Sequence, residues 1–435
     1  MNNSSQVASG NSVSVRAAYV SLFILTIAYS FNFIDRQLIA ILQEPIKAEL
    51  GLSDTQLGLL SGFAFALFYV TAGIPIARFA DRSNRKNIVA ASVFVWSFMT
   101  CVCGLANNYI QLLLARIGVG VGEAGGSPPS HSMISDLFPE EKRATAMGLY
   151  STGVNIGILF GFLLGGWLNE YFGWRVAFVV VGLPGILLAV GIGYFVKEPL
   201  RGTFDQSVGQ SEPGSFSDAM KTLWGLKTFR FLALASAMNA FAIYSVSNWT
   251  ASFMIRFHGM TTGELGSWLA VILGVGGALG VILGGVAADR LAHRDRRYYL
   301  WVPTAAMLVG APGAYFAFSL GNPYLALSVL FVPGVLLNCY LGNAIATTHS
   351  LVSPGMRATS SAILFLVINI IGMGLGPSSI GMASDMLNAT YGDASLGVAL
   401  SSIVPVAMVI ASALFYLASR YLKGDLAHLQ NRTSV

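Results

Sequence analysis

Long apolar stretches recur along almost the whole chain, and each has about the 20 residues that an α-helix needs to cross a bilayer core. They cover residues 17–42, 55–77, 88–106, 110–134, 144–168, 176–196, 231–255, 264–287, 299–320, 324–350, 358–382 and 396–421. Only helices and closed barrels satisfy backbone polar groups in lipid, and these stretches lack the two-residue alternation of barrel strands. The sequence therefore predicts an all-α membrane protein with twelve transmembrane helices.

The composition supports this prediction. Of the 435 residues, 54% are hydrophobic and only 10% are charged, against roughly 25% charged residues in an average soluble domain. A water-soluble fold is therefore excluded. The three cysteines, Cys101, Cys103 and Cys339, lie within apolar stretches and are too scattered for a disulfide framework or a zinc site. We interpret them as packing residues and expect no metal.

Basic residues are distributed unevenly about the predicted helices. If the N-terminus is cytoplasmic, 20 of the 25 Lys and Arg fall in inner segments and only Lys47, Arg175 and Arg256 fall in outer ones. The positive-inside rule then places both termini in the cytoplasm. This asymmetry explains the pI near 9.1 without a nucleic-acid partner. Without a long extracellular loop or an organelle address, we expect a prokaryotic plasma (inner) membrane, with lysosomal residence as the alternative.

The chain divides into two halves that resemble each other. We expect a disordered cytoplasmic tail at 1–15, a six-helix bundle at 16–196, a cytoplasmic linker at 197–230, a second six-helix bundle at 231–422 and a cytoplasmic tail at 423–435. His131-Ser-Met-Ile-Ser and Arg143-Ala-Thr in the first half match His349-Ser-Leu-Val-Ser and Arg357-Ala-Thr in the second. Agreement of this kind, in the same order, predicts a duplicated parallel repeat.

The loop after the second predicted helix carries a motif that is similar to one known from a large family. It reads Gly73-x3-Ala77-x3-Asp81-Arg82-x-Asn84-Arg85-Lys86. With twelve helices arranged as six plus six, this loop resembles the major facilitator superfamily. The family usually has Gly where Ala77 and Asn84 stand, and Asn is the non-Gly residue that tolerates a left-handed turn best. The resemblance implies two pseudo-symmetric bundles that transport by alternating access.

Two shorter runs resemble one branch of that superfamily. They are Asn32-Phe-Ile-Asp35-Arg36-Gln37 and Gly122-Glu123-Ala-Gly-Gly-Ser-Pro128-Pro129. Both look like the Spinster branch, whose members carry lysolipids and sphingosine phosphate. This resemblance, rather than the composition, implies that the substrate is an amphipathic anion of the lysolipid type.

Four charges lie within the predicted helices, all in the first half: Asp35, Arg36, Arg116 and Glu123. A charge at the bilayer centre costs about 2.5 to 3.5 kcal/mol, so such residues are retained for a reason. Helical rise places Asp35, Arg36 and Arg116 in one layer about 10 Å below the outer edge, with Glu123 about 10 Å deeper. We expect Asp35, with Glu123 as its partner, to take up a proton while Arg36 and Arg116 hold an anionic head group. The alternative is a set of structural ion pairs between helices one and four.

Polar residues at the helix ends and within the helices are further candidates for functional roles, and each has a structural role as the alternative. Asp81, Arg82, Arg85, Asp289 and Arg290 stand at inner helix ends, as a conformational switch or as charges that only set topology. For Asp81, the family resemblance implies a contact with a helix end across the two halves. Five residues, Asn32, Tyr244, Asn248, Asn343 and Asn369, are candidates for lining the pathway or for bonds between helices. Gly153, Gly157, Gly161 and Gly165-Gly166 form a seam that permits close helix packing.

These features together predict a proton-coupled secondary active transporter that moves a lysophospholipid-like or sphingosine-phosphate-like anion. A carrier of a small organic anion or drug is the alternative within transport, and a transport-dead receptor or a scramblase-like channel is the alternative outside it. No nucleophile elbow, phosphate-binding loop or HExxH motif is present, so we expect no enzyme activity and no cofactor. We expect the protein to act as a monomer.

Overall fold

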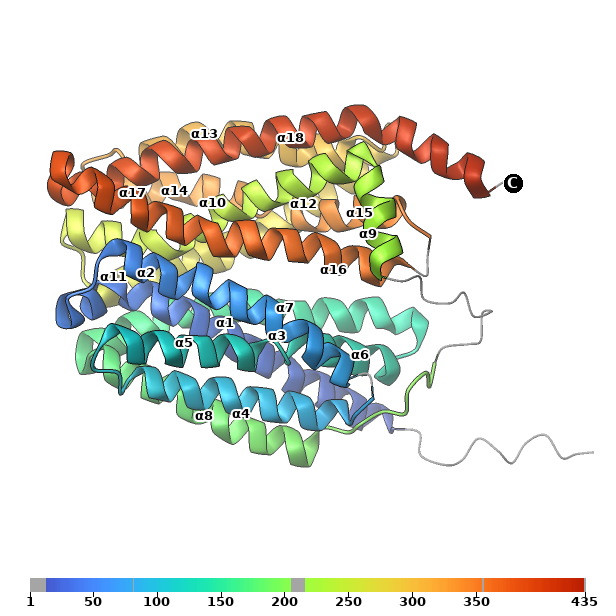
Figure 1. Cartoon of the computed structure of the whole chain (residues 1–435), viewed down its shortest axis with the longest axis horizontal. Helices are drawn as coiled ribbons and strands as arrows, with labels where there is room; N and C mark the ends of the chain where they lie inside the picture. The colour runs from blue at the N-terminus through green and yellow to red at the C-terminus, as the bar shows by residue number, and fades with distance from the viewer. Residues whose placement is uncertain (1–12, 81, 205–215, 354–355, 434–435) are drawn as a thin grey trace, which may run out of the picture.

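The structure is a computed structural model that describes residues 13–80, 82–204, 216–353 and 356–433. Within these ranges it is helical and contains no β-strand. The helices run along the long axis of the molecule as two bundles (Figure 1). Of the predicted tail at 1–15, residues 1–12 lie outside the described residues, as does 205–215 of the predicted linker.

The first half contains six crossings of the bundle. Its helices are α1 (Val15–Leu50), α2 (Asp54–Ser61), α3 (Phe63–Ala80), α4 (Arg85–Cys103), α5 (Tyr109–Glu123), α6 (Ser127–Leu137), α7 (Glu140–Phe172) and α8 (Trp174–Phe195). The pairs α2–α3 and α5–α6 each make one crossing, because only one residue and three residues, respectively, separate their members.

The second half repeats this order after the short helix α9 (Phe216–Gly225). Its helices are α10 (Lys227–His258), α11 (Thr262–Leu269), η1 (Ala270–Val275), α12 (Gly276–Ala292), α13 (Tyr298–Ala317), α14 (Pro323–Leu337), α15 (Leu341–Ser350), α16 (Arg357–Val367), η3 (Ile368–Leu375), α17 (Gly376–Tyr391), the 3-10 turn η4 (Gly392–Ala394) and α18 (Ser395–Thr433). The segments η1 and η3 are π-helical turns inside otherwise α-helical crossings.

The described residues contain ten stretches that are long and apolar enough to cross a membrane. The last of these, Thr359–Ala427, holds two crossings, α16–α17 and α18. The pair α5–α6 supplies another, which the break at residues 124–126 divides. The twelve predicted crossings are thus present, and the glycine-rich break lies directly before Pro128, at the start of α6.

Several helices differ in length from the predicted stretches. Helix α1 continues beyond residue 42 to Leu50, where Gly51 ends it with a φ of 64° and an N–H bonded to the Lys47 carbonyl. Helix α18 runs to Thr433, so the predicted tail at 423–435 begins as helix. Polar residues at a helix end do not stop the helix, and hydropathy alone therefore places these ends too early.

The two halves meet closely at the end of the molecule away from the chain termini, which we call the sealed end. Helix α1 contacts α10, where the Ser247 hydroxyl donates to Gln37 at 2.8 Å and Ser252 donates to Gln43 at 3.1 Å. Helix α2 packs on α17, and α7 packs on α11. A Cβ atom on Gly381 or Gly266 would lie 2.2 or 2.4 Å from a backbone oxygen of the other half, so glycine permits both approaches.

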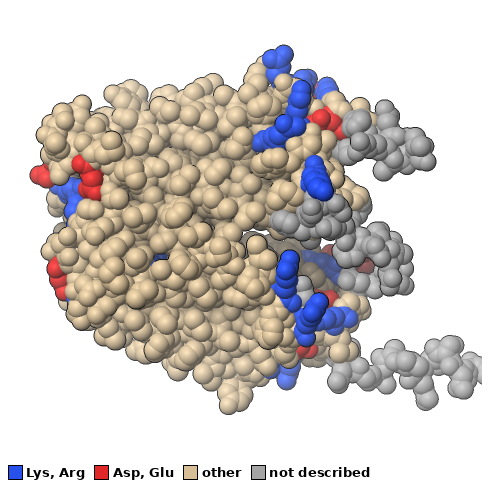
Figure 2. Space-filling model, in the orientation of Figure 1, with Lys and Arg blue, Asp and Glu red and all other residues tan. Residues whose placement is uncertain are grey.

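The opposite end holds both chain termini, and we call it the termini end (Figure 1). On the face drawn in Figure 2, Lys and Arg gather at this end, whereas the long middle of the molecule is almost free of charge. The glycine seam of α7 packs as predicted, because Cβ atoms on Gly153, Gly157 and Gly161 would meet the α1 backbone at 2.4–3.0 Å.

Candidate substrate and proton site

The centre of the site is an ion pair between α1 and α5. The Arg36 Nε and Nη2 atoms each lie 2.7 Å from Glu123 Oε2. The Glu123 side chain is fully buried, and that of Arg36 is 12% exposed. Helix α5 ends at Glu123, so the acid stands beside the break that divides this crossing. The pair therefore joins a nearly enclosed acid to an arginine that retains an open side.

The second ion pair lies within the first half. Arg116 Nη1 lies 2.7 Å from Asp35 Oδ2, and both side chains are 2% exposed. The Thr100 hydroxyl donates to Asp35 Oδ1 at 2.6 Å. Both Asp35 oxygens are thus engaged, by α5 on one side and α4 on the other. This pair is a structural connection between three helices of the first half.

Aromatic rings surround Arg36. Its Cζ atom lies 5.0 Å from the Phe33 ring centroid, 5.2 Å from that of Phe65 and 5.1 Å from that of Tyr69. Each arrangement is within the range of a cation–π interaction. The remaining Arg36 terminal nitrogen, Nη1, lies 3.9 Å from Met373 Sδ in η3. Arg36 therefore lies at the face between the halves, and its Nη1 group donates to no carboxylate.

Two polar atoms of the site have no partner among the described residues. They are Glu123 Oε1 and Arg116 Nε, and both are buried. A buried polar atom without a hydrogen bond costs about 1–3 kcal/mol. Glu123 consequently has an oxygen that can accept a proton or a donor from a bound molecule.

The predicted layer of charges is present, but with a different pairing. We predicted Asp35 and Glu123 as partners in proton uptake, with ion pairs between helices one and four as the alternative, and the structure gives each acid an arginine partner on the other of these two helices. Because neighbours on a helix point about 100° apart, Asp35 and Arg36 reach different partners. The sequence could place the four charges together but could not assign the pairs.

The predicted pathway residues lie in different settings. Asn343 donates to the Gly284 carbonyl at 3.3 Å and to the Cys339 carbonyl at 2.9 Å, so it ties α15 to α12. Asn248 donates to the Tyr244 carbonyl one turn earlier. Asn32 lines a small cavity between α1, α4, α6 and α7. Asn369 lies half-buried in η3.

Tyr244 is the predicted pathway residue that interacts with the central charges, since its hydroxyl faces Arg36 from α10. A further residue, Asn239, was not predicted. It is buried on α10 and donates to the Leu337 carbonyl at 2.8 Å, and its Oδ1 has no partner within the described part of the chain. Its position as an amide side chain within an apolar helix was the sequence signal by which it could have been predicted.

The predicted switch residues are dispersed at the termini end. Asp81 lies outside the described residues. Arg82 and Arg290 are exposed, and Asp289 accepts a bond from the Tyr299 hydroxyl at 2.8 Å. Arg85 is buried, with ion pairs to Asp136 and Glu198 of its own half.

The sealed end holds a cluster of charges that sequence reasoning missed. Arg256 of α10 pairs with Glu44 and with Asp54 of the first half, each at 2.7 Å. Lys47 also contacts Asp54, at 2.6 Å. The Asp385 carboxylate accepts from the backbone N–H groups of Asp54 at 3.1 Å and Thr55 at 2.7 Å. The scarcity of basic residues in the outer segments was a signal that Arg256 and Lys47 have specific partners.

Two duplicated six-helix halves that meet around buried charges define a membrane transporter. A sequence profile described as "Major Facilitator Superfamily" matches residues 25–377. An "MFS-type efflux pump" of Mycolicibacterium smegmatis is 33% identical over 94% of this chain and 95% of that protein. The "Sphingosine-1-phosphate transporter SPNS2" of Danio rerio is 28% identical over 93% and 86%.

A solved structure gives the same result. The crystal structure of a bacterial homologue of the human lysosomal transporter Spinster, in an inward-facing and unoccupied conformation, matches with a TM-score of 0.84. The two sequences are 33% identical, and the match covers 95% of this chain and 99% of that one. The chain therefore belongs to the major facilitator superfamily, and it is a transporter of the Spinster-like type rather than an enzyme.

Proposed function

We propose that this protein is a proton-coupled transporter of an amphipathic anion, and that Arg36 and Glu123 couple the two loads. The observation that carries the proposal is the Arg36–Glu123 pair at the face between the halves, with Arg36 Nη1 against a thioether rather than an acid. Arg36 binds the anionic head group. Glu123 takes up the proton.

Charge balance explains the coupling. Arg36 and Glu123 together carry no net charge, and an entering anion leaves one uncompensated negative charge in a nearly enclosed space. Such a charge is costly within a membrane. When the anion replaces Glu123 at the guanidinium, a proton on Glu123 restores neutrality. Anion and proton are then bound in the same state of the transport cycle.

The second ion pair has a supporting role in this proposal. Both oxygens of Asp35 are occupied by Arg116 and Thr100. We therefore assign the proton to Glu123 rather than to Asp35, and we assign to the Asp35–Arg116 pair the positioning of α5 against α1. Arg116 Nε stays a buried donor without a partner among the described residues.

An amphipathic substrate fits the surroundings of Arg36. Phe33, Phe65 and Tyr69 place apolar rings next to the cation, so a head group that binds there brings its chain into apolar contact. The relative from Danio rerio is a sphingosine-1-phosphate transporter, and sphingosine-1-phosphate is a phosphate-bearing amphiphile. We take a lysophospholipid-like or sphingosine-phosphate-like anion as the substrate class of this chain.

The orientation follows from charge. The basic residues at the termini end (Figure 2) favour a cytoplasmic position for both termini in a prokaryotic plasma membrane. In this orientation the sealed end faces outward, and we propose that the protein is in an inward-facing state and acts as a monomer.

The test is proton uptake on substrate binding in a weakly buffered detergent solution, with lysophosphatidylglycerol as the probe. The wild-type protein should bind the probe and take up about one proton per molecule, the number that charge balance requires. Glu123→Gln should bind the probe without proton uptake. Asp35→Asn serves as the matched control and should retain proton uptake. Proton uptake by Glu123→Gln would exclude the assignment.

Reconstituted vesicles test transport and the substrate class. A pH gradient should drive saturable accumulation of the probe by the wild type and not by Arg36→Gln. A scramblase-like channel or a transport-dead receptor gives no uphill accumulation. A small carboxylate that competes as strongly as the lysolipid would contradict the amphipathic substrate class and support a carrier of small organic anions.

A further inference from the structure

The termini end of the second half contains a cavity of about 560 Å³ that is remote from the Arg36–Glu123 pair. Its walls come from the start of α13, from α15, from the start of α16 and from α18. All of its lining residues belong to the second half, so it is not a part of the site between the halves. Its volume is within the range of small-molecule sites.

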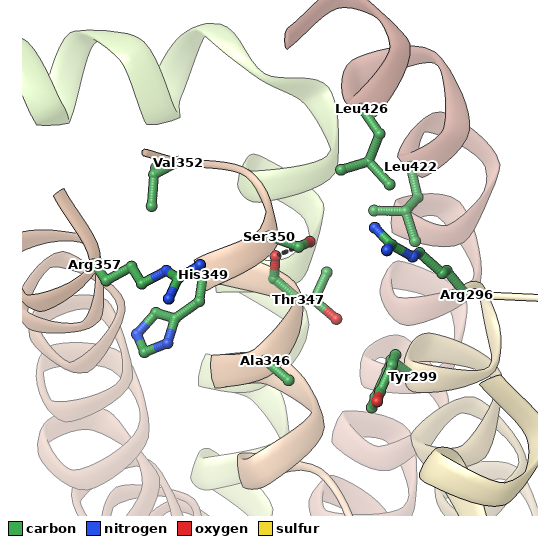
Figure 3. A pocket seen from close by; sticks show the side chains of 10 residues that line it. All are labelled: Arg296, Tyr299, Ala346, Thr347, His349, Ser350, Val352, Arg357, Leu422 and Leu426. Carbon is green, nitrogen blue, oxygen red and sulfur yellow. Dashed lines mark hydrogen bonds between the residues drawn. The ribbon is translucent and has the colours of Figure 1, made fainter. Parts of the chain in front are cut away.

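Two arginines reach into this cavity from opposite walls. Figure 3 shows Arg357 on one side, next to His349, and Arg296 on the other side, beside α18. Neither guanidinium has an ion-pair partner among the described residues. The described residues that line the cavity include no acidic one.

The other polar side chains of the walls are already engaged. Thr347 donates to the Asn343 carbonyl, Ser350 donates to the Thr347 carbonyl, and His349 bonds with Ser361 at 2.7 Å. The Tyr299 hydroxyl donates to Asp289. The two guanidiniums are thus the available donors of the cavity.

The acids of the neighbourhood are engaged as well. Asp295 pairs with Arg297 at 2.9 Å and with Lys423 at 2.8 Å, and these two cations hold the pKa of its carboxyl well below the usual range. Asp425 accepts a bond from the Thr228 backbone N–H at 2.8 Å. Neither carboxylate is among the residues that line the cavity, so within the described part of the chain the two arginines of the cavity have no ion-pair partner.

The first half shows what stands at the equivalent place. The third, fourth and sixth crossings there are α4, α5–α6 and α8, which correspond to α13, α14–α15 and α18. Between them lies Arg85, which pairs with Asp136 of α6 and, at 2.8 Å, with Glu198 after α8. It also donates to Ser132 and to the Pro199 carbonyl. The first half fills this position with a cation and two carboxylates of its own.

We infer that the cavity of the second half binds the phosphate group of an anionic membrane lipid, which supplies the negative charge that Asp136 and Glu198 supply in the first half. A phosphate accepts several hydrogen bonds and suits two guanidiniums that approach from opposite sides. The bound lipid joins α13, α15, α16 and α18, as the Arg85 cluster joins α4, α6 and the segment after α8.

The apolar part of the wall favours a lipid over a soluble phosphate. Leu422 and Leu426 line the cavity from α18. On the same helix Tyr416 is 49% exposed and Tyr421 is 37% exposed, at positions about 140° apart around the helix axis, so α18 leaves apolar ring surface open to lipid tails. An acyl chain can therefore follow α18 from the cavity into the bilayer.

The experiment measures the melting temperature of the full-length protein in a neutral detergent, titrated with short-chain phosphatidylglycerol. The lipid should raise the melting temperature of the wild type. Replacing both cations, Arg296→Gln with Arg357→Gln, should weaken the apparent affinity about tenfold or more, as expected for lost charged hydrogen bonds. The control, Arg294→Gln with Arg420→Gln, removes the same charge from exposed positions outside the cavity and should leave the affinity unchanged. Equal affinities of the two double variants would overturn the inference.

Two further measurements locate the site and the source of the phosphate. Arg36→Gln should keep the stabilisation by phosphatidylglycerol, and its loss there would assign the effect to the central site instead. Glycerol 3-phosphate should protect only at a much higher concentration, and equal potency would refute the lipid as the occupant.

A variant that supplies the missing acid covers the case in which the double variant does not fold. Ser350→Asp places a carboxylate on α15 in the cavity wall, at the position that corresponds to Ser132, which accepts a bond from Arg85 in the first half. It should raise the melting temperature without lipid and abolish the effect of phosphatidylglycerol. An unchanged lipid effect in Ser350→Asp would contradict the inference.

Discussion

At the scale of single residues, the two acids of the central layer differ because their surroundings differ. Asp35 is held by Arg116 and Thr100 inside the first half, whereas Glu123 faces Arg36 beside the break in the fourth crossing. A buried ion pair contributes little on balance, but removing one partner strands the other charge. Stability and coupling should therefore respond to different substitutions.

We predict that Asp35→Asn lowers the free energy of unfolding by about 3–5 kcal/mol, because it leaves Arg116 buried without a counter-charge. The measurement is thermal or denaturant unfolding in detergent. Glu49→Gln, on the same helix, is the control, since the Glu49 side chain is 48% exposed in its pair with Arg175, and an exposed pair is worth about 0–1 kcal/mol. Similar losses in the two variants would contradict a structural role for Asp35.

The sequence predicted the layer of charges but not its pairing. Spacing and helical rise place Asp35, Arg36 and Arg116 at one depth, because these are properties of a regular helix. Which oxygen meets which guanidinium depends on long side chains and on neighbours from other helices, such as Thr100 and Met373. Contacts across the halves, including that of Arg256, depend on tertiary packing that no local pattern encodes.

At the scale of the helices, hydropathy predicted all twelve crossings but not their interruptions. The π-helical turns η1 and η3 occur in the second and fifth crossings of the second half, and both contact the first half, η1 through α7 and η3 through α3. Such turns occur frequently at functional sites. They leave apolar composition unchanged, so the sequence pattern does not reveal them.

We predict that Gly266→Ala shifts the conformational equilibrium away from the sealed state. Its Cβ would lie 2.4 Å from the Phe162 carbonyl oxygen of α7, and a backbone atom cannot easily move aside. Gly285→Ala, later in the same crossing, meets no atom within 4 Å and serves as the control. The measurement is maleimide labelling of Ser247→Cys, in the α1–α10 contact, in a background without the native cysteines. Labelling should be about fivefold faster in Gly266→Ala, because a destabilisation of the closed sealed end by roughly 1 kcal/mol relative to the open one changes their ratio by this factor. An unchanged labelling rate would contradict tight packing between α7 and α11.

At the scale of the whole molecule, the two halves are joined at one end by charges and glycine seams and carry their basic residues at the other. Arg256 is the cation of the second half that meets two acids of the first, Glu44 and Asp54. Its side chain and that of Glu44 are 13% and 15% exposed, so water screens these pairs only partly. These ion pairs therefore stabilise the contact between the halves at the sealed end. Their loss should favour the state of the transport cycle in which this end is open.

We predict that Arg256→Gln raises about tenfold the population of molecules in which the two halves have separated at the sealed end. A tenfold change corresponds to about 1.4 kcal/mol, which is within the range for hydrogen bonds to charged groups. Spin labels at Ile110→Cys and Asn388→Cys, exposed positions of the two halves at this end, report the distance between the halves. The wild type should give mainly the short distance, and the variant should add a longer one. Arg175→Gln removes a cation at the same end whose partner, Glu49, belongs to the same half, so it should leave the distances unchanged. Because Lys47, of the same half, still bonds to Asp54 in Arg256→Gln, the first half keeps its local structure, and a longer distance reports separation of the halves rather than unfolding.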